Sequence, residues 1–343
     1  SVRYYKSFLQ TGFMSMDPQT GYVKAWVGGI NHKHFKYDHV KESKRQVGST
    51  FKPFVYALAI MEGWSPCKRI PNVPVTIEVP GQQSWTPQNS SDKKYNNKEL
   101  TLQFALALSV NSITAYIMKQ FGPKAVISVT KKMGVTSPID EVPSICLGSA
   151  DLSVYEMVGA NSTFANKGTF IQPLYITRIE DKNGKVLADF VPEKEEVMDE
   201  EKAYIMLQLM KGVVQYGTGS KLRYMYKLST PIAGKTGTTQ NHSDGWFMGI
   251  TPDLVSGCWV GAEDRSVHFD NIDEGQGAAM ALPIWGLYMQ KVYADKTIKI
   301  SKGEFEKPAK SIEIEMDCKK YNEELEKGAI DFDSTTKDEE KWE

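Results

Sequence analysis

The chain has 343 residues and a formal net charge of −1, with 41% hydrophobic and 24% charged residues, values typical of a soluble globular protein. They exclude a collagen-like rod, a coiled coil and a wholly disordered chain, and they predict about two domains or one domain with an inserted lobe. The charge is uneven, because residues 301–343 hold 14 acidic and 8 basic residues. We interpret residues 301–343 as an acidic, flexible tail. No long Lys/Arg stripe indicates a nucleic-acid partner.

The longest apolar runs fall far short of the roughly 20 residues that a membrane-spanning helix needs, and no signal peptide is recognisable at the start. If the chain is a fragment, this says nothing about its compartment. The four cysteines are too far apart for a zinc knuckle or a redox pair. Three disulfide pairings are open, and we favour cysteines that act as small buried hydrophobes.

The first elements expected are a hairpin and a buried helix. Residues 1–10 are interpreted as a linker remnant, and residues 11–29 alternate in polarity around a turn at Asp17–Gly21, which predicts a hairpin. Phe54–Met61 is apolar on every side, so a buried helix is predicted there, with Ser49 as a plausible N-cap. Residues 65–98, rich in Pro, Asn, Ser and Gln, indicate a long loop.

Helices and then strands are predicted over the rest of the chain. The predicted helices cover residues 99–109, 112–120, 125–133, 153–166 and 200–214. The predicted strands cover 230–239, 245–251 and 254–262, and a last helix covers 278–292. Strands near both ends with helices between them predict an α+β fold: an antiparallel β-sheet built from both chain ends, flanked by helices, with an inserted, mostly helical lobe at about residues 54–225. The main domain is expected over residues 11–300.

Three short motifs carry the chemistry. They are Ser49-Thr50-Phe51-Lys52 (S-x-x-K), Ser109-Val110-Asn111 (S-x-N) and Lys235-Thr236-Gly237-Thr238 (K-T-G-T). S-x-x-K occurs six times in the chain, but only the copy at Ser49 begins a predicted buried helix. The significance therefore lies in the order of the three motifs and in the element beneath each.

The first motif suits a nucleophile and its base. Serine is a weak nucleophile that needs an adjacent base, and Lys52 lies three residues later on the same helix face. A free lysine has a pKa near about 10.4, which burial and a second cation, for which Lys235 is the candidate, would lower. The Ser49 N–H at the helix start points where an oxyanion would develop.

The other two motifs suit substrate handling. Ser109 could relay a proton to a leaving amine, and Asn111 could hold the substrate backbone. On the predicted strand Lys235 and Gly237 share one face, and Gly237 would let a ligand approach closely. An extended peptide could pair with the strand edge. Lys235, Thr236 and Thr238 could together hold a carboxylate, with the Thr238 N–H completing an oxyanion hole.

The three motifs together are the signature of penicillin-binding proteins and class A β-lactamases. Further segments resemble the transpeptidase domain of class A (bifunctional) penicillin-binding proteins, in the β-lactamase/transpeptidase-like superfamily. They are Asp17–Gly29, Lys44–Phe54, Leu147–Ser149, Glu156–Met157, Phe164–Gly168, Tyr216–Gly219 and Gly234–Thr239. The resemblance covers about residues 5–295. Val110 stands where β-lactamases usually carry Asp, and no E-x-x-L-N motif follows, which argues against a β-lactamase.

The resemblance implies a serine D,D-transpeptidase. Its substrates would be peptidoglycan stem peptides, a D-Ala-D-Ala donor and an amine acceptor, and β-lactams would acylate it. The implied catalytic residues are Ser49, Lys52, Ser109, Asn111 and Lys235, and the implied substrate-binding residues are Thr236, Gly237 and Thr238. Neither a metal nor an organic cofactor is expected. The parent protein would be membrane-anchored, with a glycosyltransferase domain, and would act at the outer face of the cytoplasmic membrane, in the periplasm.

Other activities stay open on the same scaffold, namely a D,D-carboxypeptidase, a β-lactam hydrolase or a β-lactam sensor. A phosphate-binding loop at Gly234-Lys235-Thr236 is disfavoured, because position 229 is Ser and not Gly. His32, His34 and His39 lack the second ligand cluster that a metal site would need.

Overall fold

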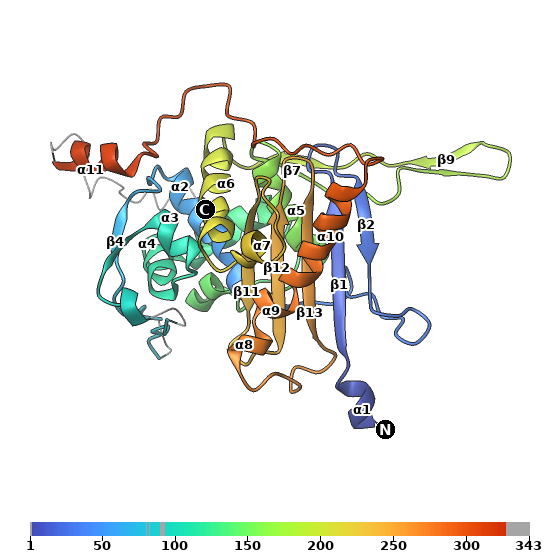
Figure 1. The fold of residues 1–343 in the computed structure, drawn as a ribbon, viewed down its shortest axis with the longest axis horizontal. Coiled ribbons are helices and arrows are strands. Elements are labelled where there is room, and N and C mark those ends of the chain that lie inside the picture. The colour runs from blue at the N-terminus through green and yellow to red at the C-terminus, as the bar shows by residue number, and fades with distance from the viewer. Residues whose placement is uncertain (1, 80, 82, 90–92, 327–343) are drawn as a thin grey trace.

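A five-stranded antiparallel sheet forms the centre of the structure (Figure 1), a computed structural model that describes residues 2–79, 81, 83–89 and 93–326. The strand order is β11-β12-β13-β1-β2. The bounds are Leu9–Met16 (β1), Val23–Val27 (β2), Ala233–Thr238 (β11), Asp244–Ile250 (β12) and Val255–Ala262 (β13). Because β1 pairs with β13 in antiparallel register, the predicted sheet built from both chain ends is confirmed.

Both faces of this sheet are covered. Met14, Trp246 and Met248 point to one face, where α5 (Val154–Ala165) packs, whereas Phe13 and Phe247 point to the other, where α10 (Leu282–Ala294) packs. Burial on both faces explains why β12 and β13 have long apolar runs without strict alternation. The predicted helix over 278–292 is α9 (Gly277–Met280) followed by α10.

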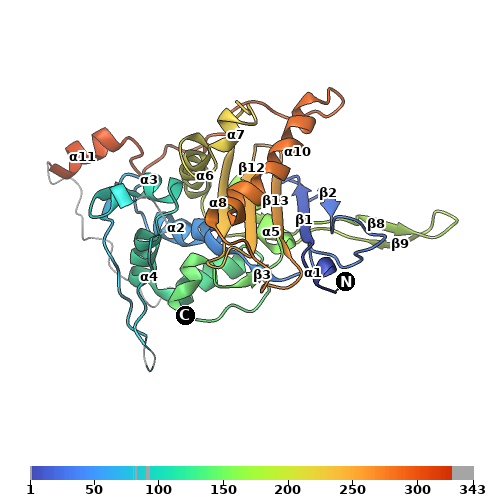
Figure 2. The same ribbon diagram turned by 60° about the horizontal axis from the view of Figure 1, so that its bottom comes forward.

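The helical lobe consists of α2 (Lys52–Met61), α3 (Leu102–Ala107), α4 (Asn111–Lys132) and α6 (Glu200–Gln215), which pack against one another beside β11 (Figure 2). α2 is buried along Lys52–Ile60, as its apolar sequence predicts. Helices predicted at 112–120 and 125–133 are the two halves of α4, which Gly122 (φ 76°) and Pro123 interrupt.

One predicted helix begins late. Residues 99–101 of the predicted helix 99–109 form strand β5 (Glu99–Thr101), which pairs with β4 (Arg69–Pro71). The Thr101 hydroxyl then caps α3 by accepting from the N–H of Phe104. The local sequence does not oppose a helix at residues 99–101, so the pairing with β4 accounts for the strand.

Short elements complete the described chain. They are α1 (Val2–Lys6), β3 (Arg45–Gln46), η1 (Gly48–Phe51), η2 (Lys93–Tyr95), η3 (Pro143–Leu147), β6 (Asp151–Leu152), β7 (Thr169–Ile171), β8 (Arg178–Glu180), β9 (Val186–Asp189), β10 (Lys194–Glu196), α7 (Lys221–Tyr224), α8 (Ile272–Gly275) and α11 (Cys318–Glu326). The β8–β9 hairpin projects from the side opposite the helical lobe (Figures 1 and 2). None of the helices in the described ranges has the length and apolar character needed to cross a membrane.

The expected flexible tail over 301–343 is wrong for residues 301–326, which lie along the helical lobe and end in α11 (Figure 1). Phe305 is buried in the lobe's core, and Ile312 and Ile314 pack against it. The acidic residues also find basic partners, such as Glu304 with Lys211 at 2.7 Å. Residues 327–343 lie outside the described residues.

A disulfide bond fixes this C-terminal segment to the lobe. Cys67, six residues after α2, is bonded to Cys318 at the start of α11, with 4.9 Å between their Cα atoms. The expectation of buried, unpaired cysteines holds for Cys146 and Cys258 but not for this pair. No local spacing could have indicated a bond between positions 251 residues apart.

Candidate active site

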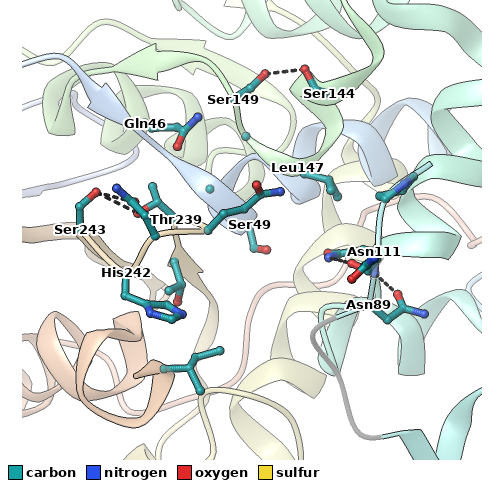
Figure 3. Close-up of a pocket in the computed structure, with 18 of the residues that line it drawn as sticks. Gln46, Ser49, Asn89, Asn111, Ser144, Leu147, Ser149, Thr239, His242 and Ser243 are labelled. Carbon is teal, nitrogen blue, oxygen red and sulfur yellow. Dashed lines mark hydrogen bonds between the residues drawn. The ribbon is translucent and has the colours of Figure 1, made fainter. Parts of the chain in front are cut away.

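Ser49 lies in η1, the 3₁₀ turn that leads directly into α2. It is not the N-cap that the sequence suggested, because the N-cap of α2 is Phe51 and that of η1 is Val47, so that Ser49 stands inside the turn. The residue is partly exposed and lines a cavity of about 850 Å³. In Figure 3, Ser49 stands between Thr239 and His242 on one side and Asn89 and Asn111 on the other.

Two glycines allow the chain to pack tightly around the Ser49 turn. The N–H of Gly48 donates to the carbonyl of Gly148 at 3.0 Å, and a Cβ on Gly148 would lie 1.8 Å from the Gly48 oxygen. A Cβ on Gly237 would lie 2.7 Å from the carbonyl oxygen of Val47. The missing side chain of Gly237 therefore serves the contact between β11 and the Ser49 turn, whereas the sequence suggested close approach of a ligand.

Two buried lysines meet at one serine hydroxyl. Lys52 Nζ donates to the Ser109 carbonyl oxygen at 2.6 Å, to Ser109 Oγ at 3.2 Å and to Asn111 Oδ1 at 2.6 Å. Lys235 Nζ donates to the same Ser109 Oγ at 2.9 Å. The structure thus brings the first motif's lysine together with residues of the second and third motifs. Among the described residues, no hydrogen bond joins Lys52 to Ser49.

Burial changes the acidity of both lysines. Both side chains are fully buried, and burial lowers the pKa of Lys52 to about 7. Burial, followed by repulsion from Lys52, also lowers the pKa of Lys235 well below its usual value. The sequence suggested that Lys235 would be a cause of the shift at Lys52, but burial is the dominant cause there. A neutral amine is therefore present near neutral pH beside Ser109.

Ser109 has an uncommon backbone conformation between α3 and α4. Its φ of 58° is in the left-handed region, which is costly for a residue with a side chain. Lys52 Nζ donates to both the carbonyl and the hydroxyl of Ser109. This contact holds the residue at the end of α3, where the sequence placed it.

The third motif lies on β11, at the edge of the sheet. The Thr236 hydroxyl is 2.6 Å from the hydroxyl of Thr218, and the Thr238 hydroxyl accepts from the N–H of Gly277 at 3.1 Å. Because Thr238 Oγ1 accepts that bond, its own hydrogen remains available to the cavity that Thr238 lines. None of the three motifs indicated a role for Thr218, although the Tyr216–Gly219 segment is part of the family resemblance.

A second contribution that the sequence did not indicate comes from residues Trp85–Asn89, which we call the wall loop. All five line the cavity, and in Figure 3 Asn89 lies across it from Thr239, the residue that follows β11. The carbonyl of Gln88 accepts from Asn111 Nδ2 at 2.7 Å. The only indication in the sequence was the polar composition of residues 65–98, which did not show which of these residues would line the cavity.

The described part of the chain has no group of three or more His, Cys, Asp and Glu side chains placed to bind a metal ion. His39 is buried and stacks on Trp259, with 5.2 Å between ring centroids. Burial, and after it the positive charge of Arg45, lowers the pKa of His39. His39 is therefore part of the core.

Known proteins are similar in sequence over most of this chain. The chain is 32% identical over 312 residues to penicillin-binding protein 1A of Aquifex aeolicus, covering 91% of this chain and 41% of that protein. It is 31% identical over 290 residues to penicillin-binding protein 2D of Bacillus subtilis, covering 83% of this chain and 41% of that protein. The chain thus spans less than half the length of either relative.

Solved structures are similar as well. Penicillin-binding protein 1A of Haemophilus influenzae matches with a TM-score of 0.78 and 25% identity, over 88% of this chain and 50% of that one. PonA1 of Mycobacterium tuberculosis in complex with penicillin V matches with a TM-score of 0.70 and 24% identity, over 88% and 81% of the two chains. The family model "Penicillin binding protein transpeptidase domain" matches residues 11–257. The chain therefore belongs to the penicillin-binding protein transpeptidase domain family.

Proposed function

We propose that the chain is a serine D,D-transpeptidase that cross-links peptidoglycan stem peptides through an acyl-enzyme on Ser49. The observation that carries the proposal is the meeting of Lys52 and Lys235 on the Ser109 hydroxyl beside the Ser49 cavity. This arrangement supplies an amine that is partly neutral near pH 7 and a hydroxyl through which protons can move.

In the first half of the reaction, Ser49 Oγ attacks the carbonyl carbon of the penultimate D-Ala. Lys52 takes the hydroxyl proton, which its lowered pKa of about 7 favours. The peptide C–N bond breaks, and Ser109 passes a proton to the leaving nitrogen of the terminal D-Ala. Lys52, which donates to Ser109 Oγ, replaces that proton and returns to the neutral form.

In the second half, an amine from a neighbouring stem peptide attacks the ester carbon of the acyl-enzyme. Ser109 and Lys52 take its proton and return one to Ser49 Oγ as the ester bond breaks, so that the new amide is the cross-link. Asn111 has one N–H left over from its bond to Gln88, which suits a carbonyl of the donor backbone.

The donor peptide would lie along the edge of β11. An extended chain can add to an edge strand by main-chain hydrogen bonds, and β11 is such a strand. Its terminal carboxylate would face Thr236, Thr238 and Lys235, where hydroxyl and amine groups lie buried or partly buried. β-Lactams that imitate the D-Ala-D-Ala end would acylate the same serine, and the similar PonA1 structure is a complex with penicillin V.

Membership of the family also supports a proposal about the surroundings of the domain. We propose that the parent protein is membrane-anchored, carries a glycosyltransferase domain and works at the outer face of the cytoplasmic membrane. The share of the relatives that this chain spans, 41%, leaves room for those parts.

The test is the intact mass of the protein after incubation with benzylpenicillin. We expect one added penicilloyl group on the parent, stable for many minutes, and none on Ser49→Ala, whose folding is checked by circular dichroism. Release of D-Ala from a stem peptide with formation of a dimer, only when an acceptor amine is present, then identifies transfer. D-Ala release without a dimer would make the domain a carboxypeptidase, and drug consumption without an adduct would make it a β-lactamase.

A further inference from the structure

The N-terminus of α4, which begins at Asn111, is capped by a residue from elsewhere in the chain. The preceding residue, Val110, makes no side-chain cap, although the first N–H groups of a helix need acceptors. Asn89 Oδ1 of the wall loop accepts from the N–H of Asn111 at 2.9 Å and of Ser112 at 3.0 Å. One side chain thus provides the cap from 22 residues away.

The opposite end of the Asn89 amide is also held. Its Nδ2 donates to Asn72 Oδ1 at 2.8 Å and to Ser112 Oγ at 3.2 Å. Asn72 and Ser112 are 2% and 1% exposed, and Asn72 Nδ2 donates in turn to the Tyr95 carbonyl at 2.9 Å. Every neighbour therefore selects the same orientation of the Asn89 amide.

The wall loop forms hydrogen bonds with Asn111 at two points. Asn89 binds its backbone N–H, and the carbonyl of Gln88 binds its side-chain Nδ2 at 2.7 Å. On its other side, Asn111 Oδ1 accepts from Lys52 Nζ at 2.6 Å. Figure 3 shows Asn89 and Asn111 adjacent at the edge of the cavity that holds Ser49. A shift of the wall loop would therefore move the contact with Lys52 as well.

We propose that Asn89 is a positioning residue of this site: by capping α4 and fixing the Gln88 carbonyl, it holds the Asn111 amide between Lys52 and the donor peptide. The inference rests on the proposed function, because its readout is acylation of Ser49. A loop asparagine that only stabilised α4 would affect folding, whereas a positioning residue affects the rate of the folded protein and acts through Asn111.

The first test measures acylation by a fluorescent penicillin, resolved into the affinity of the noncovalent complex and the first-order acylation rate. Asn89→Ala is expected to slow acylation roughly 10- to 100-fold, the scale of small displacements in active sites. Asn96→Ala, an exposed asparagine in the same region of the chain, is the matched control and is expected to match the parent.

The decisive test is a double-mutant cycle with Asn111→Ala. If Asn89 acts through Asn111, adding Asn89→Ala to Asn111→Ala slows acylation less than about twofold. Losses that multiply would overturn the positioning role. Urea melts of each variant separate rate from unfolding.

The two proposals fail in different ways. A folded parent that takes no penicilloyl group at Ser49 would overturn the proposed function and this inference with it. If benzylpenicillin or its fluorescent analogue labels Asn89→Ala as fast as the parent, this inference alone is overturned.

Discussion

Lys44 and Lys52 stand on either side of η1 in the sequence, and they belong to two clusters of charged groups whose hydrogen-bond partners differ. After η1, Lys52 and Lys235 share the hydroxyl of Ser109, and their described hydrogen-bond partners include no carboxylate. Before η1, Lys44 pairs with the buried carboxylate of Glu156 at 2.7 Å. The first cluster has amines whose pKa values are lowered. In the second, hydrogen bonds from the protein surround a carboxylate that is almost fully buried.

The Glu156 cluster shows how a buried charge is stabilised. Thr136, Ser137 and Ser153 each donate both a backbone N–H and a hydroxyl to its carboxylate. Burial by itself would raise the pKa of Glu156, but hydrogen bonds from Lys44, Ser153 and Ser137 outweigh it and lower the pKa to about 2. The two clusters differ in the charge of the partners: a lysine and neutral donors stabilise the Glu156 carboxylate, whereas the three acceptors of Lys52 are neutral oxygens and burial lowers its pKa. The proposed mechanism uses the neutral amine that results.

The largest expected effect is that of Lys52→Arg. Arginine keeps a positive charge but is not deprotonated in proteins, so acylation by benzylpenicillin should fall roughly 10³-fold, the scale of a lost general base. In the parent, the rate should rise about tenfold per pH unit below about 7 and level off above it, since Lys52 must be neutral. Stopped-flow acylation between pH 5 and 9 provides both readings. A variant as fast as the parent would exclude Lys52 as the base.

Glu156→Gln should show the reverse pattern, with lost stability and intact chemistry. A pKa of about 2 in the folded state against 4.5 in the unfolded state corresponds to about 3 kcal/mol. Because the folded pKa is the lower one, this stability is present above about pH 4.5 and is lost as the pH falls towards 2. Urea unfolding at pH 7 and pH 3 should therefore show a larger difference between parent and variant at pH 7.

Acylation per folded molecule provides the control for this comparison. Glu156 lies outside the hydrogen bonds of Lys52 and Lys235, so the Glu156→Gln rate at 25 °C should match that of the parent. If acylation fell as far as in Lys52→Arg, the two clusters would be one functional unit, and the contrast between them would be wrong.

Sequence patterns predicted the sheet, the buried helix α2 and the residues that meet at Ser109, because each depends on local periodicity or on a short motif. They did not predict which groups Lys52 would touch. Spacing along a helix puts Lys52 within reach of Ser49, but its hydrogen bonds are to Ser109 and Asn111, which tertiary packing brings to it.

Several of the parts that sequence reasoning missed are long-range. The wall loop, the Thr218 contact and the Cys67–Cys318 bond join positions that no period or spacing relates. The C-terminal segment was misjudged for the same reason. Its acidic composition is typical of a solvated tail, but Phe305, Ile312 and Ile314 are spaced so that each reaches the lobe's core.

The smallest expected effect separates the two kinds of donor at Glu156. The Lys44 side chain is 41% exposed, so water and salt screen its charge, and Lys44→Met should cost less than about 1 kcal/mol of the free energy of unfolding. Six bonds from Thr136, Ser137 and Ser153 would remain. The measurement is urea unfolding of parent and variant at low and high salt, where the difference should shrink as salt is added. A loss as large as that of Glu156→Gln would mean that the ion pair, and not the neutral donors, holds the carboxylate, and that this buried charge depends on an opposite charge after all.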